Sequence, residues 1–583
     1  MVARRISTFF LALAVLFLSP PGTSQTEDNT ATLSEIVDAY EQFVRVTNPT
    51  EAARAKGRGV TSWPDVSPEA EAQQARRIGE FLAGLEAVPE EERASADFSI
   101  LQTILSESAA LHEHDPSRIP FTGDWGFHSN LLAYARRVDI RSRRDARDYI
   151  RLLKATPEHF ESHIANMRRG IETGFTAYTD PLDVTIEQIA EQVVSDPKES
   201  DLYAPFLDMK GLSDVQAAAI RKDAESAVGL AVQAFAEVHK FLDEDYREHA
   251  RPEPGIGSVP GGEAAYAAYV KTHTTRPDLS PIEVHEIGKS EVDRIRGEME
   301  DIIEETGFDG SFSEFLTFLR TSPEFYAESP EDLLEKASRI SKRLDAILPR
   351  YFGKLPRLPY GVEPVDPAIA PGFTTGRYSG GDAKSGTPGT YLVNTYRLDQ
   401  RPLYQLPALS AHEAVPGHHL QIALAQELEN VPRFRQSYYA TAFGEGWGLY
   451  SEKIAGEAGI YQTPYERFGA LSYEMWRACR LVADTGLHYY GWSRTEAETC
   501  FRENTALSEL NIKTEVTRYI GWPGQALGYK IGEITIRELR AEAEAALGDD
   551  FDIREFHDKV LEDGSMPLGM LEEKIRTWIE EAR

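Results

Sequence analysis

The chain has 583 residues, 94 acidic and 62 basic side chains, and a formal net charge of −32 at pH 7. A surface of that charge repels nucleic-acid phosphates and anionic lipid, so neither nucleic acid nor a membrane is an expected partner. The length allows a large core, and the two cysteines exclude a disulfide-rich scaffold. Cys479 and Cys500 either form one bridge in an oxidising compartment or are two small buried residues.

The first residues have the pattern of a secretory signal peptide, predicted to span residues 1–24. Arg4 and Arg5 precede an apolar run from Phe9 to Leu18 that is too short to span a bilayer. No cysteine lies near the expected cleavage point at Ser24 to carry a lipid. We therefore expect an exported protein, periplasmic or extracellular, without stable membrane anchoring after signal cleavage.

Residues 25–350 are predicted to form a helical framework. Capping signals at Thr32, Ser280 and Ser329 each precede a run of apolar residues at helical spacing. The framework is expected to form one body with the rest of the chain, around a shared cleft.

Residues 351–583 are predicted to form the metal-binding catalytic part. Dense proline and glycine from Tyr351 to Gly389 indicate loops. The β-branched and aromatic segment Thr390–Tyr396 is the best strand candidate, and its free edge would suit pairing with an extended peptide, although an ordinary hairpin strand is an equal alternative. From Pro407 onward the pattern is helical again.

Three histidines and a glutamate gather within Ser410–Gln421. Glu413 follows His412 directly, and His418 and His419 come shortly after. Neutral imidazoles bind zinc, and a carboxylate beside them can accept a proton from water on the metal. An isolated His-Glu pair is usually structural, but this density in a chain with 14 histidines favours a metal site.

The spacing of these histidines excludes an unbroken helix as the scaffold. In a straight helix His412 and His418 point roughly 240° apart, whereas His412 and His419 share a face but lie about 10 Å apart along the axis. Pro416 and Gly417 permit a local bulge, because proline removes a backbone donor and glycine accepts most backbone angles. We predict that a bulge returns His418 to the face of His412, with His419 as the alternative ligand.

A third ligand is expected from the segment Phe443–Glu452. Glu445 follows His418 after enough residues for the metal helix to end and the chain to return, and Gly444 and Gly446 would permit close approach to that helix. Glu452 lies two turns further on the same face. Glu452 is the competing candidate for the third ligand. Alternatively, it supports a ligand through a hydrogen bond or is a surface charge.

Two imidazoles and one carboxylate suit zinc best, although cobalt or manganese can also occupy such a set. We therefore expect one Zn²⁺ per chain, held by His412, His418 and Glu445. Glu413 would act as general base on the water in the fourth position, and the hydroxide would attack a carbonyl group.

At these residues the chain resembles the bacterial family catalogued as domain of unknown function 885 (DUF885). The hallmark stretches of that family, His-Glu-x-x-Pro-Gly-His and Glu-Gly-Trp-x-x-Tyr-x-Glu, occur here at 412–418 and 445–452. Further matching segments at 274–288, 388–395, 484–488 and 518–529 extend the resemblance over most of the mature chain.

The DUF885 family is similar to the zincin (gluzincin-type) metallopeptidases. The resemblance implies a mainly α, large helical zincin-like fold with a deep central cleft and a small β-sheet next to the metal helix, together with peptide-bond hydrolysis. It supports His412, His418 and Glu445 as ligands and Glu413 as base. The inserted Pro-Gly pair departs from the histidine spacing of the zincin relatives.

By analogy with such clefts, a donor to the oxyanion is expected from the C-terminal helices. The candidates are Tyr529, Tyr519, Arg518 and His488, and for each the alternative is a packing or ion-pair role. His285 and His557 lie in matching segments but fit structural hydrogen bonds.

The sequence thus predicts a zinc metallopeptidase for short peptides, of oligopeptidase, dipeptidase or carboxypeptidase type. A hydrolase of a non-peptide amide or ester would need the same chemistry. An inactive protein that binds peptides in the cleft is the alternative from another class.

Overall fold

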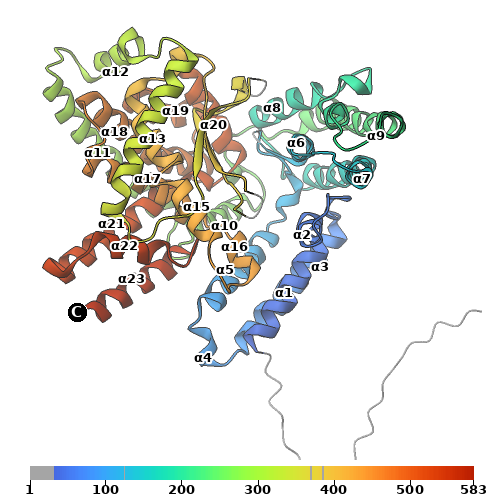
Figure 1. Cartoon of the computed structure of the whole chain (residues 1–583), viewed down its shortest axis with the longest axis horizontal. Helices are drawn as coiled ribbons and strands as arrows, with labels where there is room; N and C mark the ends of the chain where they lie inside the picture. Colours follow the sequence, from blue (N-terminus) through green and yellow to red (C-terminus); the bar gives the residue numbers. More distant parts are fainter. Residues whose placement is uncertain (1–31, 124, 368–369, 384–385) are drawn as a thin grey trace, which may run out of the picture.

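The computed structural model describes residues 32–123, 125–367, 370–383 and 386–583. The predicted signal peptide, residues 1–24, lies outside the described residues. Helices dominate, and a three-stranded sheet accompanies them, so the predicted mainly α class is confirmed (Figure 1). Within the described part of the chain, no helix combines the length and the apolar character needed to cross a membrane.

The predicted helix starts are confirmed. Capping boxes precede α1 (Leu33–Thr47) and α11 (Pro281–Thr306), and Ser329 caps α13 (Pro330–Tyr351). Each cap satisfies backbone N–H groups that have no partner within the helix.

The helices before α11 divide between two bodies (Figure 1). The first body is a lobe with a core of its own, formed by α6 (Phe127–Ala135), α7 (Arg143–Thr173), α8 (Thr179–Ala190) and α9 (Asp214–Lys240). Ala53 of α2 (Pro49–Ala55) also belongs to this core. Helices that instead join the core of the larger body are α1, α3 (Pro68–Glu86), α5 (Ala96–His112) and α10 (Gly262–Thr274). The short α4 (Glu90–Arg93) connects α3 to α5.

The larger body is completed by helices from the middle and the end of the chain. They are α12 (Phe312–Thr321), α14 (Leu406–Glu413), α15 (His418–Gln426), α16 (Arg433–Ser437), α17 (Thr441–Glu457), α18 (Pro464–His488), α19 (Arg494–Asn504), α20 (Glu509–Gly521), α21 (Gly528–Leu547), α22 (Ile553–Leu561) and α23 (Leu568–Ala582). The most extensive packing is of α11 along α18 and of α17 along α21. Helices on both sides of residue 350 therefore share cores.

The sheet has the strand order β1-β3-β2. β3 (Gly389–Val393) pairs in parallel with β1 (Tyr360–Pro364) and antiparallel with β2 (Gly376–Ser379). β3 is the predicted strand, although it ends at Val393 and not at Tyr396. The prediction of loops alone from Tyr351 to Gly389 is wrong. β1 includes Gly361 and Pro364 and β2 begins at Gly376, so proline and glycine keep these strands short but do not exclude them.

The central position of β3 also corrects the expectation of its free edge. Both edges of β3 are paired, so it cannot take up a further strand. The outer strand next to α14 is β2: the backbone N–H of Tyr378 points away from β3 and donates to Oε2 of Glu413 at 2.7 Å. An edge beside the expected base therefore exists, but on a different strand.

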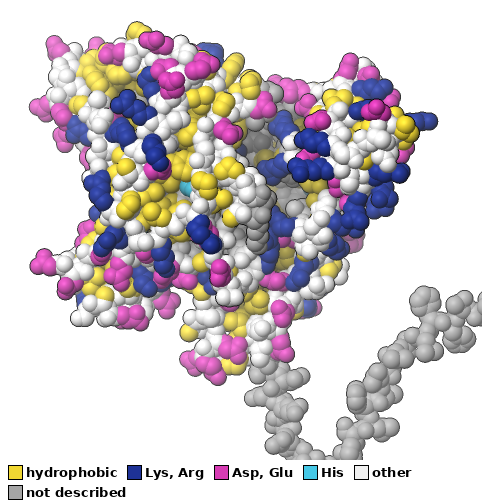
Figure 2. Space-filling view, in the orientation of Figure 1, with side chains coloured by type: hydrophobic (Ala, Val, Ile, Leu, Met, Phe, Trp, Pro, Cys, Tyr) yellow, Lys and Arg dark blue, Asp and Glu magenta, His cyan; other side chains and the backbone are white. Residues whose placement is uncertain are grey.

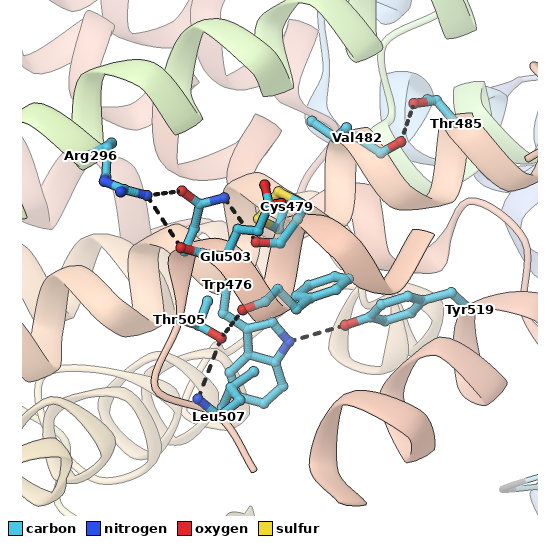
Figure 3. The surroundings of a disulfide bond; sticks show 12 residues. Arg296, Trp476, Cys479, Val482, Thr485, Glu503, Thr505, Leu507 and Tyr519 are labelled. Carbon is cyan, nitrogen blue, oxygen red and sulfur yellow. Dashed lines mark hydrogen bonds between the residues drawn. A yellow bond between two sulfur atoms is a disulfide. The ribbon is translucent and has the colours of Figure 1, made fainter. Parts of the chain in front are cut away.

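Cys479 and Cys500 form a disulfide, which joins α18 to α19 (Figure 3). The same region is tied together by hydrogen bonds, among them one from the indole N–H of Trp476 to Tyr519 Oη at 3.0 Å (Figure 3). The choice that the sequence leaves open is thus decided in favour of a bridge.

The visible surface is uneven in charge and shape. Asp and Glu are spread over the whole face drawn in Figure 2, whereas many of its Lys and Arg side chains gather on the α6–α9 lobe. That face is hollowed between the lobe and the larger body (Figure 2).

Candidate metal centre

The helix that carries His412 is interrupted directly after Glu413. α14 ends there, α15 begins at His418, and the residues between them are not helical. Ala414 has φ −93° and ψ −111°, and Gly417 has φ −75° and ψ −129°. The expected local bulge is therefore a complete break between two helices.

Two contacts hold this break in place. The backbone N–H of Gly417 donates to the carbonyl of Ala411 at 2.9 Å, and the indole N–H of Trp447 donates to the carbonyl of Pro416 at 2.8 Å. A Cβ atom on Gly417 would lie 1.9 Å from the carbonyl oxygen of His412. Only glycine can therefore occupy this position without moving the backbone that carries His412.

The break brings the two predicted imidazoles to the same carboxylate. Nε2 of His412 lies 3.6 Å and Nε2 of His418 lies 3.4 Å from Oε2 of Glu445. The three atoms all lie within 4.8 Å of one another. Two ligands of a tetrahedral zinc ion, each about 2.1 Å from it, lie about 3.4 Å apart. The donor set and its spacing therefore fit zinc.

Glu445 reaches this position because α17 passes close to both α14 and α21. The approach to His412 occurs at Gly448, where a Cβ atom would lie 2.7 Å from the imidazole ring. The glycines expected to permit it serve elsewhere: Gly446 lies against the backbone of Gly532 in α21, and Gly444 faces the ring of Tyr439.

The two competing ligands have other partners. Oε1 of Glu452 accepts a hydrogen bond from Nδ1 of His412 at 2.9 Å, so Glu452 contacts a predicted ligand from behind. His419 is held between the hydroxyl of Tyr378 and the carbonyl of Leu358, each at 3.0 Å. Geometry therefore favours Glu445 and His418.

The carboxylates favour a positive charge at this centre. Burial alone would lower the pKa of His412, but hydrogen bonds to Glu445 and Glu452 outweigh it and raise the pKa to about 10. Burial alone would raise the pKa of Glu445, yet the neighbouring His418 and His412 hold it well below its usual value. A divalent cation would satisfy the same preference.

Glu413, the predicted base, ends α14 at the rim of this centre. It is half-buried, and its carboxylate is oriented by the N–H of Tyr378 in β2. The strand thus fixes the direction of the carboxylate next to His412.

Two of the predicted oxyanion donors, His488 and Tyr519, form hydrogen bonds inside the core. In His488, Nδ1 accepts from the N–H of Ile256 and Nε2 donates to the carbonyl of Tyr519, each at 3.0 Å. The hydroxyl of Tyr519 accepts from Trp476 and Arg480 and donates to Glu515. Their hydrogen-bonding capacity is used inside the core, so neither suits a role at the metal centre.

Arg518 and Tyr529 remain as candidate oxyanion donors. Nη2 of Arg518 lies 3.4 Å from the hydroxyl of Tyr529, and the guanidinium of Arg480 lies 4.3 Å from the centre of the Tyr529 ring. Tyr529 is in the first turn of α21, one turn before Gly532, which touches the glycine beside Glu445. The hydroxyl is therefore held on the part of α21 that packs on α17, the helix of Glu445.

Tyr439 also contacts the candidate metal centre, although no sequence pattern predicts it. Its hydroxyl donates to Oε1 of Glu445 at 3.3 Å, while 43% of its surface stays exposed. It precedes α17 in an irregular segment, where no periodicity indicates the direction of a side chain. The two histidines set aside as structural behave as expected: His285 bonds to Thr485, and His557 bonds to Tyr450 and to a backbone carbonyl.

A second group of carboxylates has a different character. Glu291, Glu474 and Glu533 surround the fully buried ammonium group of Lys530, at 2.9, 2.7 and 2.8 Å. Lysine already supplies the positive charge there, and the group ties α11, α18 and α21 together.

A family model described as bacterial protein of unknown function (DUF885) matches residues 49–575. The chain belongs to the DUF885 family. Among curated proteins, none matches it.

Two solved structures resemble this DUF885 protein over nearly its whole length. One, from Colwellia psychrerythraea, is described as a "putative lipoprotein"; it is 27% identical, covers 94% of this chain and 99% of its own, and superposes with a TM-score of 0.87. The other, from Shewanella oneidensis, is described as a "putative lipoprotein of unknown function"; it is 17% identical over 93% of this chain and 99% of its own, with a TM-score of 0.72. The second likeness concerns the fold alone.

Proposed function

We propose that this DUF885 protein is a zinc-dependent metallopeptidase that hydrolyses short peptides, with a zincin-like arrangement of its active site in a cleft. The observation that carries the proposal is the convergence of Nε2 of His412, Nε2 of His418 and Oε2 of Glu445, with Glu413 beside them. Two imidazoles and one carboxylate, with a fourth position left for water, are typical of catalytic zinc.

A zinc ion held by His412, His418 and Glu445 would supply Lewis acidity and lower the pKa of a water that it binds to about 7. Glu413 accepts a proton from the attacking water and passes it to the leaving amine, so one water is consumed for each bond cleaved. The N–H of Tyr378 keeps the Glu413 carboxylate in place for both transfers.

Donors for the negative charge on the carbonyl oxygen come from outside the ligand set. Tyr529, oriented by Arg518 and Arg480, is our first choice, because its hydroxyl has a cationic neighbour and lies on the helix that packs against α17. Tyr439 is the second, because its hydroxyl already contacts Glu445 and its ring is exposed.

The outer edge of β2 supports a peptide as the substrate. Tyr378 directs its N–H away from the sheet and toward Glu413. An extended peptide lying along this edge would bring a backbone carbonyl next to the base. A non-peptide amide or ester would use the same base and metal without the strand, and an inactive peptide-binding protein would use the strand without the metal.

The location proposed for the protein is outside the cytoplasm. A disulfide persists in an oxidising compartment. The similar proteins from Colwellia and Shewanella are each described as a "putative lipoprotein". In this chain both cysteines are joined to each other. We therefore propose that the protein is exported, to the periplasm or the outside of the cell.

The decisive experiment combines metal analysis with one substitution. The purified protein is expected to contain about one zinc per chain and to cleave some members of a panel of dipeptides and tripeptides with free and blocked termini. Glu413→Gln should keep the zinc and lose at least about 10²-fold in cleavage rate. Glu429→Gln, which changes an exposed glutamate on the loop after α15, should behave like the unmodified protein.

Unchanged turnover in Glu413→Gln would remove the proposed base. A protein that binds zinc but cleaves only amide or ester substrates lacking a peptide backbone would favour the second hydrolase. Peptide binding without zinc and without cleavage would favour the inactive binding protein.

A further inference from the structure

A cavity of about 210 Å³ lies away from the metal centre, where the lobe meets the larger body. Phe121, from the core of the lobe, lines it on one side, and Phe175 and Ile256, from the core of the larger body, line it on the other, together with Tyr269 and Trp522. None of these residues contributes to the candidate metal centre. The walls are mostly apolar, with two tyrosines, Tyr178 and Tyr269, among the lining residues.

One lining residue carries a charge. Arg251 is only 5% exposed, and its guanidinium donates to four backbone carbonyls, those of Thr176, Glu253, Pro254 and Ile520. Within the described ranges, no carboxylate lies within ion-pair distance of it, and its titratable neighbours are tyrosines, which are uncharged at neutral pH. Burial lowers the pKa of Arg251 to about 10, which leaves the side chain protonated at neutral pH.

Carbonyl dipoles hold this guanidinium but do not neutralise it. A buried cation without an anionic partner is costly, and elsewhere in this chain the buried cations have carboxylates: Arg480 pairs with Glu515, and Lys530 with three glutamates. Arg251 is the exception among these, and it borders this cavity. An anionic ligand in that volume would supply the missing charge.

The volume limits the ligand. A cavity of about 150 Å³ lined by apolar side chains holds benzene, so 210 Å³ admits an aromatic or branched aliphatic group together with one small polar group. A phosphate ester or a dianion would leave one charge among the apolar walls, which is unfavourable.

We infer that this cavity binds a small free carboxylic acid with an apolar body, its carboxylate beside Arg251 and its apolar part against Phe121 and Phe175. The inference does not rest on the proposed hydrolase. It concerns a site separate from the zinc ligands, and it holds whether or not the metal centre is catalytic.

The test compares 3-phenylpropionate with the neutral 3-phenylpropan-1-ol by titration calorimetry on the full chain. The acid is expected to bind at least about tenfold more tightly than the alcohol, because a charge-assisted contact contributes more than a neutral one. Arg251→Lys should keep this preference, whereas in Arg251→Gln the ratio of the affinities for acid and alcohol should fall to about one. Ile119→Trp, which fills the cavity from a half-buried lining position, should weaken the binding of both ligands.

The control for binding at the metal centre is His412→Ala, in which the acid should bind as before. The inference would be overturned if the unmodified protein bound acid and alcohol equally or bound neither. It would also be overturned if His412→Ala no longer bound the acid. If Arg251→Gln fails to fold because four carbonyls lose their donor, Ile119→Trp still decides: unchanged binding of the acid in that variant places it elsewhere.

Discussion

Oε1 of Glu452 accepts a hydrogen bond from Nδ1 of His412 at 2.9 Å, and the opposite nitrogen of the same ring faces Glu445 at 3.6 Å. A carboxylate on Nδ1 fixes the hydrogen there and leaves the lone pair of Nε2 available to a metal. Glu445 and Glu452 lie on the same helix, α17, so one element supplies both a predicted ligand and the group that orients another.

This relationship predicts different effects for two neighbouring glutamates. Glu452→Ala should weaken zinc affinity about 10–100-fold, because it removes support from a ligand and not the ligand itself. Glu445→Ala should weaken it further, because it removes a ligand. Zinc competition with a chelator measures both, and Glu457→Ala, on the last turn of α17, is the control. Loss of zinc in Glu452→Ala with retention in Glu445→Ala would exchange the two roles.

A second prediction concerns Gly448. A Cβ atom there would lie 2.7 Å from the His412 ring, so Gly448→Ala should displace the imidazole and lower both zinc affinity and activity. Gly297 in α11 has nothing within 4 Å of such an atom. Gly297→Ala should therefore leave zinc affinity unchanged and stabilise the protein by up to about 1 kcal/mol. Equal zinc affinity in the two variants would show that α17 can move away from α14.

The sequence indicates the residues of the candidate metal centre better than their arrangement in space. Spacing alone shows that His412 and His418 need a break at Pro416-Gly417, because helix geometry excludes every straight alternative. The extent of the break depends on contacts from α17, such as the hydrogen bond from Trp447 to the Pro416 carbonyl. Such contacts between segments far apart in the chain leave no local pattern.

The same limit explains the misplaced strand edge and the missed tyrosine. The composition of β3 predicts a strand, but its central position follows from two short neighbours that proline and glycine conceal. Tyr439 approaches Glu445 from an irregular segment, and His488 and Tyr519 turn into the core. The directions of these three side chains are set by tertiary packing, which leaves no local pattern in the sequence.

A third prediction concerns the disulfide. Cys479 and Cys500 are 21 residues apart, and closing a loop of this size stabilises a folded protein by about 3 kcal/mol in the chain-entropy estimate. The denatured, unreduced protein should show no free thiol, and reduction should release two per chain. The double variant Cys479→Ser, Cys500→Ser should have a lower thermal midpoint. Two thiols that titrate without reduction would contradict the bridge.

The α6–α9 lobe contains a pair of histidines that should make its stability depend on pH. His159 and His163 lie one turn apart on α7, with their Nε2 atoms 3.3 Å apart. The rings stack on Trp63 and Phe127, respectively. Burial lowers the pKa of His159 to about 4, and burial with the charges of neighbouring histidines lowers that of His163 to about 3.

In the unfolded chain both imidazoles titrate near pH 6.5. Between about pH 6.5 and 4 the unfolded state binds protons that the folded state excludes, so stability is fully present above pH 6.5 and falls as the solution is acidified. Each histidine contributes up to about 1.4 kcal/mol per pH unit. His163→Gln should therefore reduce the fall of the calorimetric midpoint between pH 7 and 4.5. Parallel pH profiles in the variant and the unmodified protein would mean that the folded lobe admits the proton.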